Sequence, residues 1–177
     1  MNREAQLRRR IRMLTWLFIA GLVLSGVTAI PVRWEVNLLI KFLGAEELGS
    51  HSATDVDPLT RWLFIARNAL DKLENEDPFL FYGLDWLAFG HFVIAIAFIG
   101  ALRDPVRNIW LFTFGLIACV LVIPYALIFG ALRGIPFWWR LIDCSFGVFG
   151  FIPLWLCRKW TRELMENAGG SRAPLSG

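Results

Sequence analysis

The chain has 177 residues, of which 56% are hydrophobic and only 19% are charged, and it contains 15 Phe and 9 Trp. This composition excludes a disordered chain, a collagen-like chain and a disulfide scaffold, and it lies well outside that of soluble globular domains. The net charge is only +3, so overall charge gives no indication of nucleic-acid binding. The sequence therefore predicts an integral membrane protein.

Four long apolar stretches predict membrane-spanning helices: residues 13–30, 79–102, 109–132 and 141–157. A bilayer core needs about 20 helical residues, and all four stretches are long enough. None alternates apolar with polar residues as a barrel strand must, and helices satisfy their own backbone groups in lipid. We therefore expect an all-α integral membrane protein, a four-transmembrane-helix bundle that forms a single membrane domain over residues 1–177, with a cytoplasmic tail at 158–177.

The first stretch also has a second interpretation. A basic start, an apolar stretch and Val27-Thr28-Ala29 describe a signal peptide whose cleavage would remove residues 1–29. The stretch is longer than the usual signal core of about 7 to 15 residues, and Pro31 lies next to the cleavage position, which disfavours cleavage. We predict a retained anchor, and a purified chain beginning at Ile30 would contradict it.

Between the first two spans, residues 31–78 predict a short helical segment outside the bilayer. Asp57 can cap a helix, Pro58 suits its first position, and Pro78 stops it. One face of this helix is apolar and the other polar, as in a helix that lies on a surface. The apolar face holds Leu59, Trp62, Leu63, Ala66, Leu70 and Leu73, and the polar face holds Arg61, Arg67, Asn68, Asp71 and Lys72.

Residues 34–43 predict a shorter amphipathic helix of the same kind, and residues 44–56 between the two read as a loop. Two interpretations of these helices are open. They either cap the bundle or rest on lipid, and capping is slightly favoured.

Basic residues predict the orientation, because positively charged flanks stay cytoplasmic. If the N-terminus is inside, the inner flanks carry eleven basic and four acidic residues, net +7, whereas the outer side carries seven basic and eleven acidic residues, net −4. Both termini are then cytoplasmic, and we expect a plasma or inner membrane protein. Most tryptophans fall at the ends of spans, where amphipathic rings anchor in the interface.

Small residues predict where the spans approach each other, since packing replaces the hydrophobic effect as the association force in lipid. They recur at spacings of three, four or seven: Gly83, Gly90 and Ala97; Gly115 and Cys119; Ala126 and Gly130; Gly147 and Gly150. Pro124 and Pro153 lie inside the third and fourth spans and are expected to kink them.

Ionisable groups inside the spans are the candidates for chemistry, because each is costly there and needs a partner. The candidate catalytic residues are Asp85, His91 and Asp143. Both aspartates lie near outer span ends and are expected to share one layer, with Arg140 as a counter-ion. His91 points away from Asp85 on an ideal helix, so its partner is expected from another span: Ser145, Tyr125 or Asp143. A histidine bonded to a carboxylate would be a candidate acid or base.

Two interpretations of these residues remain. In the first they form an outer-leaflet pocket for a lipid or small amphipathic substrate, with Arg140, Tyr125 and Ser145 as candidate ligand-binding residues. In the second, which is favoured, they make interhelical hydrogen bonds that fix the bundle.

We expect no metal and no cofactor. The cysteines at 119, 144 and 157 are scattered without a CxxC motif, which disfavours zinc and redox chemistry. Only one histidine lies in a span, whereas a haem between helices usually takes two axial ligands. Nucleotide-binding and standard hydrolase motifs are also missing from the sequence.

The function predicted first is that of a non-enzymatic accessory or assembly subunit of a membrane complex. The alternative is a lipid- or lipophile-binding or modifying bundle that uses the outer Asp/His site, and a channel or carrier is disfavoured because few polar groups line the spans. Expected partners are membrane lipids and a protein partner or a second copy of the chain, with no nucleic acid.

Overall fold

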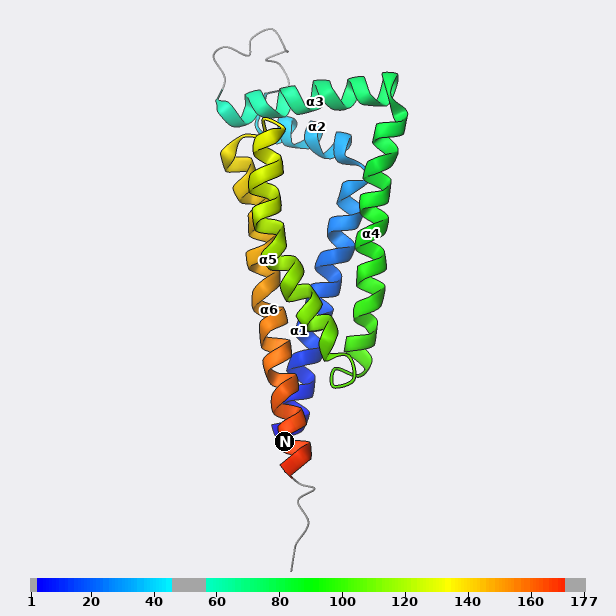
Figure 1. Ribbon diagram of the computed structural model, residues 1–177. Coiled ribbons are helices and arrows are strands. Elements are labelled where there is room, and N and C mark those ends of the chain that lie inside the picture. Colours follow the sequence, from blue (N-terminus) through cyan, green and yellow to red (C-terminus); the bar gives the residue numbers. More distant parts are fainter. Residues whose placement is uncertain (1–2, 46–56, 171–177) are drawn as a thin grey trace, which may run out of the picture. The chain divides into compact units, whose positions relative to one another are not determined.

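The computed structural model describes residues 3–45 and 57–170, and throughout these ranges the regular structure is helical, with no strand. The elements in chain order (Figure 1) are α1 (Arg3–Ala29), α2 (Val32–Phe42), α3 (Pro58–Glu76), α4 (Pro78–Arg103), α5 (Ile109–Leu132) and α6 (Phe137–Gly170). The predicted all-α class is confirmed. The loop predicted at 44–56 falls mostly outside the described residues.

Four of the helices, α1, α4, α5 and α6, are long and apolar enough to cross a membrane. They contain the predicted spans except for residue 30, which follows the end of α1, and α5 has the predicted bounds. Two helices extend beyond the predicted spans: α1 already begins at Arg3, and α6 continues through residue 158 as far as Gly170. Loss of apolar character marks the end of a span but not of a helix, because Arg, Glu, Leu and Met are good helix formers in water too.

Contacts divide the chain into two compact units, one formed by Leu22–Val93 and the other by the residues up to Gly21 together with those from Ile94 onward. Helices α1 and α4 each contribute one part to each unit. We call the first unit the 22–93 unit and the second the α5–α6 unit.

In the 22–93 unit, α2 and α3 run across the direction of the adjoining parts of α1 and α4 (Figure 1). Helix α3 begins as predicted: Asp57 Oδ1 accepts hydrogen bonds from the backbone N–H of Leu59 and Thr60 at 2.9 and 3.1 Å, and Thr60 Oγ1 donates to Asp57 Oδ2 at 2.6 Å. Since these bonds favour the carboxylate, the Thr60 hydroxyl first among them, they hold the pKa of Asp57 below its ordinary value.

Helix α3 packs on α2 through a face that overlaps only in part with its predicted apolar face. Its buried residues are Thr60, Leu63 and Phe64, and the last two form an apolar cluster with residues 36, 40 and 45. Leu59, placed at the centre of the predicted face, is exposed. The reason is that α2 presents an arginine as well as apolar side chains, so the polar edge of α3 also takes part in the contact.

That arginine is Arg33 of α2. Its Nε lies 2.7 Å from Asp71 Oδ1, and its Nη1 bonds to Glu74 Oε2. Asp71 belongs to the predicted polar face of α3, and the edge of that face contacts α2. Two carboxylates of α3 therefore bind one cation of α2, next to the apolar cluster.

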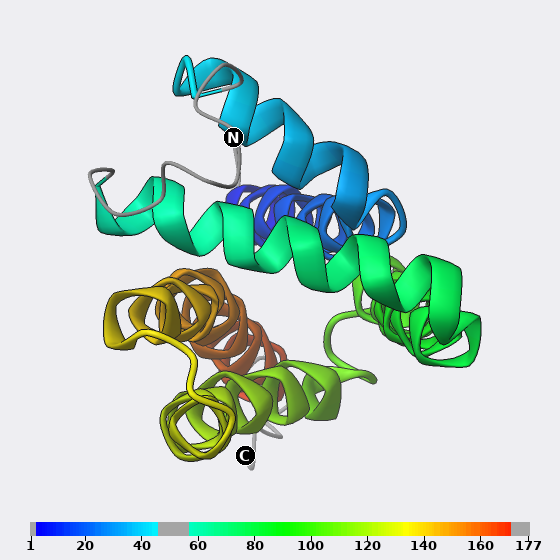
Figure 2. The same ribbon diagram turned by 90° about the horizontal axis from the view of Figure 1, so that it is seen from above.

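In the α5–α6 unit, α5 and α6 run alongside each other as an antiparallel pair (Figures 1 and 2). The connection between them contains Gly134 with φ of +70°, a conformation that favours glycine. A Cβ at Gly147 would stand 2.5 Å from the carbonyl oxygen of Cys119, and one at Gly150 would stand 3.0 Å from Cys119 Sγ. Small residues of the third and fourth spans thus lie at a close contact between helices, as predicted for them.

The predicted seam on α4 is wrong at two positions, because a Cβ added at Gly83 or Gly90 would meet no atom within 4 Å. The close approach within the 22–93 unit instead involves Gly26 of α1, where a Cβ would stand 2.7 Å from the Phe92 ring and 3.1 Å from both Ala88 O and His91 Cβ. A glycine pattern on one helix does not reveal which face meets a neighbour, since Ala and larger residues also line such contacts.

Candidate functional site

Asp85 lies on α4 between aromatic side chains. Tyr82, Asp85, Trp86 and Phe89 line an open depression of about 250 Å³. The Trp86 ring packs edge-on against Tyr82 at 6.0 Å and against Phe89 at 5.5 Å between ring centroids. Asp85 is exposed, and among residues 3–45 and 57–170 it has no hydrogen-bond or ion-pair partner. This carboxylate therefore stands within an apolar helix with aromatic rings on either side.

His91 lies further along α4, in the same unit as Asp85. Its Nδ1 is 2.8 Å from the carbonyl oxygen of Leu87, one turn earlier in its own helix. The expectation that its partner comes from another span is therefore wrong for this nitrogen. The contact arises because the close approach of Gly26 leaves the Cβ of His91 against α1, so the ring turns back along α4.

Arg140 lies on α6, in the other unit, and its guanidinium does not pair with Asp143 in the described structure. Its Nη1 donates to the carbonyl oxygen of Leu127 on α5 at 3.1 Å, and its guanidinium carbon lies 5.3 Å from the centre of the Phe137 ring. The stem passes over Gly130, where a Cβ would stand 2.5 Å from Arg140 Cδ. A cation near the C-terminal carbonyls of a helix is favourable, so Arg140 ties the last turns of α5 to α6.

The remaining candidates belong to the same unit as Arg140. Ser145 Oγ donates to the carbonyl oxygen of Ile142 in its own helix at 2.6 Å, and Tyr125 is exposed with its ring 4.5 Å from that of Phe129. Asp143 is partly buried and forms no hydrogen bond or ion pair with any described residue. Among Arg140, Tyr125, Asp143 and Ser145, the structure brings no two side chains into a hydrogen bond or an ion pair.

The predicted site residues are thus divided between the two units. Asp85 and His91 belong to the 22–93 unit, and Tyr125, Arg140, Asp143 and Ser145 belong to the α5–α6 unit. The meeting of Asp85 with Asp143 stays a prediction. Arg140 makes a hydrogen bond between two helices, as the structural interpretation of the site predicts. His91 and Ser145 each bond to a carbonyl of their own helix, as polar side chains within apolar helices often do.

Sequence reasoning missed a buried polar cluster in the α5–α6 unit. Thr15 of α1 and Thr161 of α6 are both fully buried, and each hydroxyl donates to the carbonyl one turn earlier, at 2.8 and 2.7 Å. Thr15 Oγ1 also lies 3.8 Å from Cys157 Sγ, which joins the two helices. Nearby, Arg158 Nε donates to Thr113 Oγ1 at 3.0 Å. Isolated threonines in apolar runs carry no pattern that predicts such pairing.

The cysteines at 119, 144 and 157 are all buried and unpaired, and no group of three or more His, Cys, Asp or Glu in the described ranges is arranged to hold a metal ion. Cys119 and Cys157 act here as small packing residues against α6 and α1.

No protein-family model matches the sequence, and no curated protein or solved structure matches it either. The proposals below accordingly rest on the residues and geometry of the chain itself.

Proposed function

We propose that the chain is a non-enzymatic accessory or assembly subunit of a membrane complex. The observation that carries this proposal is Asp85, an exposed carboxylate on an apolar helix with no partner among the described residues. An aspartate near the middle of a bilayer costs roughly 2.5 to 3.5 kcal/mol, and somewhat less near an interface. A hydrogen-bond donor or cation from another polypeptide would offset that cost, whereas hydrocarbon would not.

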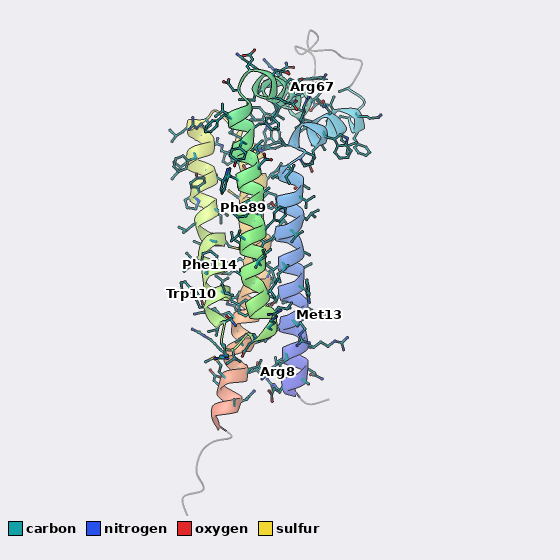
Figure 3. The ribbon with its side chains drawn as sticks, turned by 90° about the vertical axis from the view of Figure 1, so that its right-hand side faces the viewer. Arg8, Met13, Arg67, Phe89, Trp110 and Phe114 are labelled. Carbon is teal, nitrogen blue, oxygen red and sulfur yellow. The ribbon has the colours of Figure 1, made fainter. Side chains whose placement is uncertain are left out.

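The aromatic residues around Asp85 support a protein contact. Phe89 points outward from α4 (Figure 3), with 54% of its surface exposed, and Trp86 and Tyr82 are similarly open. Aromatic side chains surrounding one polar group are typical of the centre of a protein interface. A transmembrane helix carrying Arg, Lys, Asn or Gln at the matching depth, from another protein or a second copy of this chain, fits this depression.

We further propose the topology that this role requires: a four-helix membrane bundle in a plasma or inner membrane, with both termini cytoplasmic and residues 31–78 on the outer side. The charge difference between the two sets of flanks supports it. A reporter fused to the C-terminus is expected to stay cytoplasmic, and an insertion near residue 50 is expected to be exported. The reverse result would contradict the orientation.

Site-specific photocrosslinking tests the subunit proposal. A benzophenone amino acid replaces Phe89 beside Asp85, and the matched control replaces Phe146, an exposed phenylalanine on α6. We expect a protein adduct of defined mass at position 89 but not at 146. Adducts with lipid alone at both positions would contradict the proposal.

A second candidate function is a lipophile-binding or lipid-modifying bundle. The observation that favours it is the same open depression, because an amphiphile with a cationic head could place the head on Asp85 and its apolar part on Trp86 and Phe89.

Native purification in mild detergent with mass spectrometry separates the two functions. Asp85→Asn removes the charge at the depression, and Asp77→Asn, beyond the end of α3, is the matched control. A protein companion lost only in the first variant supports the subunit role. A single small lipophile lost only in that variant supports the second function instead.

A further inference from the structure

Away from the Asp85 depression, the α5–α6 unit contains a small pocket whose rim is basic. Arg8 and Arg12 of α1 and Arg103 at the end of α4 line it, over a floor that includes Ile11 and Pro105. Both floor residues are buried. The space is about 30 Å³, enough for the oxygen atoms of one acidic group rather than for a whole headgroup.

The charges at this pocket do not cancel. Arg8 is paired with Glu4, with Nη2 2.9 Å from Oε1. Arg12 and Arg103 are exposed and have no ion pair in the described part of the chain. The nearby carboxylate of Asp104 accepts a hydrogen bond from the backbone N–H of Arg107 at 3.0 Å, and so serves the turn between α4 and α5. Two guanidinium groups from separate helices therefore face one opening without a counter-ion.

The chemistry of the rim selects phosphate. Guanidinium groups bind phosphate oxygens through paired N–H donors, and two groups on separate helices can grip one phosphate from two sides.

The surroundings place this phosphate on a lipid. Directly after the arginines, α1 exposes Met13, Trp16 and Leu17, and α5 exposes Trp110. In Figure 3, Arg8, Met13 and Trp110 lie toward the same end of this unit. Arginines followed within one turn by exposed tryptophan and aliphatic side chains are typical of the headgroup level of a bilayer.

We infer that Arg12 and Arg103, with Arg8 beside them, form a binding site for the phosphate group of an anionic phospholipid. Basic pockets between membrane helices are suited to such headgroups. Binding in this pocket should depend on these particular arginines, whereas binding to a diffuse basic surface depends only on the total charge.

The test compares two double variants that lose the same charge. Arg12→Gln with Arg103→Gln removes the unpaired rim, whereas Arg9→Gln with Arg107→Gln removes two exposed arginines close by that do not line the pocket. Binding is measured on the detergent-purified full chain by native mass spectrometry with phosphatidylglycerol, with phosphatidylcholine and with inorganic phosphate. Circular dichroism confirms that each variant keeps its helices.

The wild-type chain is expected to prefer phosphatidylglycerol to phosphatidylcholine, and the rim variant to bind phosphatidylglycerol at least about tenfold more weakly while the control changes by less than about threefold. Equal losses in the two variants, or no preference between the lipids, would overturn the site. Binding of inorganic phosphate that exceeds the lipid binding would assign the pocket to a soluble anion and overturn the lipid proposal. Arg12→Lys with Arg103→Lys should recover part of the affinity, since the charge returns without the paired donors.

Discussion

The α5–α6 pair and the α2–α3 pair are both two helices in contact, but they are held in different ways. Where α5 meets α6, glycine brings backbones together, with Gly147 against the Cys119 carbonyl. Where α2 meets α3, larger apolar side chains interdigitate and Arg33 binds two carboxylates. The first pair contains candidate membrane spans and the second does not. Close packing is the force available in lipid, and apolar burial is the force available in water.

The largest effect is expected in the α2–α3 cluster. Leu63 has 1% of its surface exposed there, whereas Ile65 on the same helix has 51%. Leu63→Ala should destabilise the packing of α3 on α2 by about 2 to 4 kcal/mol, because it removes buried methyl groups and leaves a cavity. Ile65→Ala should cost less than about 1 kcal/mol.

Hydrogen exchange of α3 in the detergent-purified protein measures both values. Equal protection in the Leu63 and Ile65 variants would show that apolar burial does not hold this pair.

The next effect compares a glycine at the α5–α6 contact with a glycine of α4 that meets no neighbour. Gly147→Ala places a methyl group 2.5 Å from the Cys119 carbonyl oxygen, so α5 and α6 must separate at a cost of about 1 to 3 kcal/mol. Gly83→Ala meets no atom within 4 Å, and the better helix propensity of alanine should leave stability unchanged or raise it by up to about 1 kcal/mol.

Unfolding of the two alanine variants in mixed micelles of increasing denaturing detergent gives the difference in stability. A Gly147 variant as stable as the Gly83 variant would refute the close contact between α5 and α6 at this glycine.

A smaller effect is expected for the ion pairs of α2 and α3. Arg33, Asp71 and Glu74 are between one third and one half exposed, so solvent screening reduces what they contribute. Arg33→Gln should therefore cost about 0.2 to 1 kcal/mol, and 1 M salt should abolish most of the difference from wild type. Arg61→Gln, an exposed arginine of α3, is the control. Loss of several kcal/mol that salt does not alter would mean that the pair is buried more deeply than its exposure indicates.

The smallest effect is a pH dependence at the start of α3. The folded pKa of Asp57 is lowered below its ordinary value of 3.8. Its cap is therefore fully effective above pH 3.8 and weakens as the pH falls below that value toward the folded pKa. Protection factors at the N-terminus of α3 should fall over this range in the wild type. Asp57→Asn keeps an acceptor for the backbone N–H groups but does not titrate, so its protection should stay constant; a parallel fall would assign the change to another group.

The elements of this fold were largely predictable, because each rests on local signals. Runs without charge identified the spans, and Asp57 followed by Pro58 located the start of α3. The start of α1 and the end of α6 were not predictable, because hydropathy indicates which residues a bilayer covers and not where the backbone hydrogen bonds of a helix stop. The contact of α3 with α2 could not be read from the amphipathic pattern, because it also uses the polar Asp71, which binds Arg33 of α2.

The candidate site was less predictable than the fold. An ionisable group within a span is rare, and this marked Asp85, His91 and Asp143 as residues to explain, but their partners depend on rotation and depth in three dimensions. Arg140 reaches the Leu127 carbonyl because Gly130 makes room for its stem, which no spacing rule reveals. Likewise, Arg12 and Arg103 are far apart in sequence, so their shared pocket could not be predicted from either flank alone.

Only Asp77 separates the end of α3 from the start of α4, and its backbone has φ −134° and ψ 61°. Such a joint has almost no slack. A change in the tilt of α3 must either change the backbone dihedral angles of this one residue or change the tilt of α4 as well. The orientation of α3 is therefore coupled to that of the helix that carries Asp85. A ligand that moved α3 would therefore also move the start of the helix that carries Asp85.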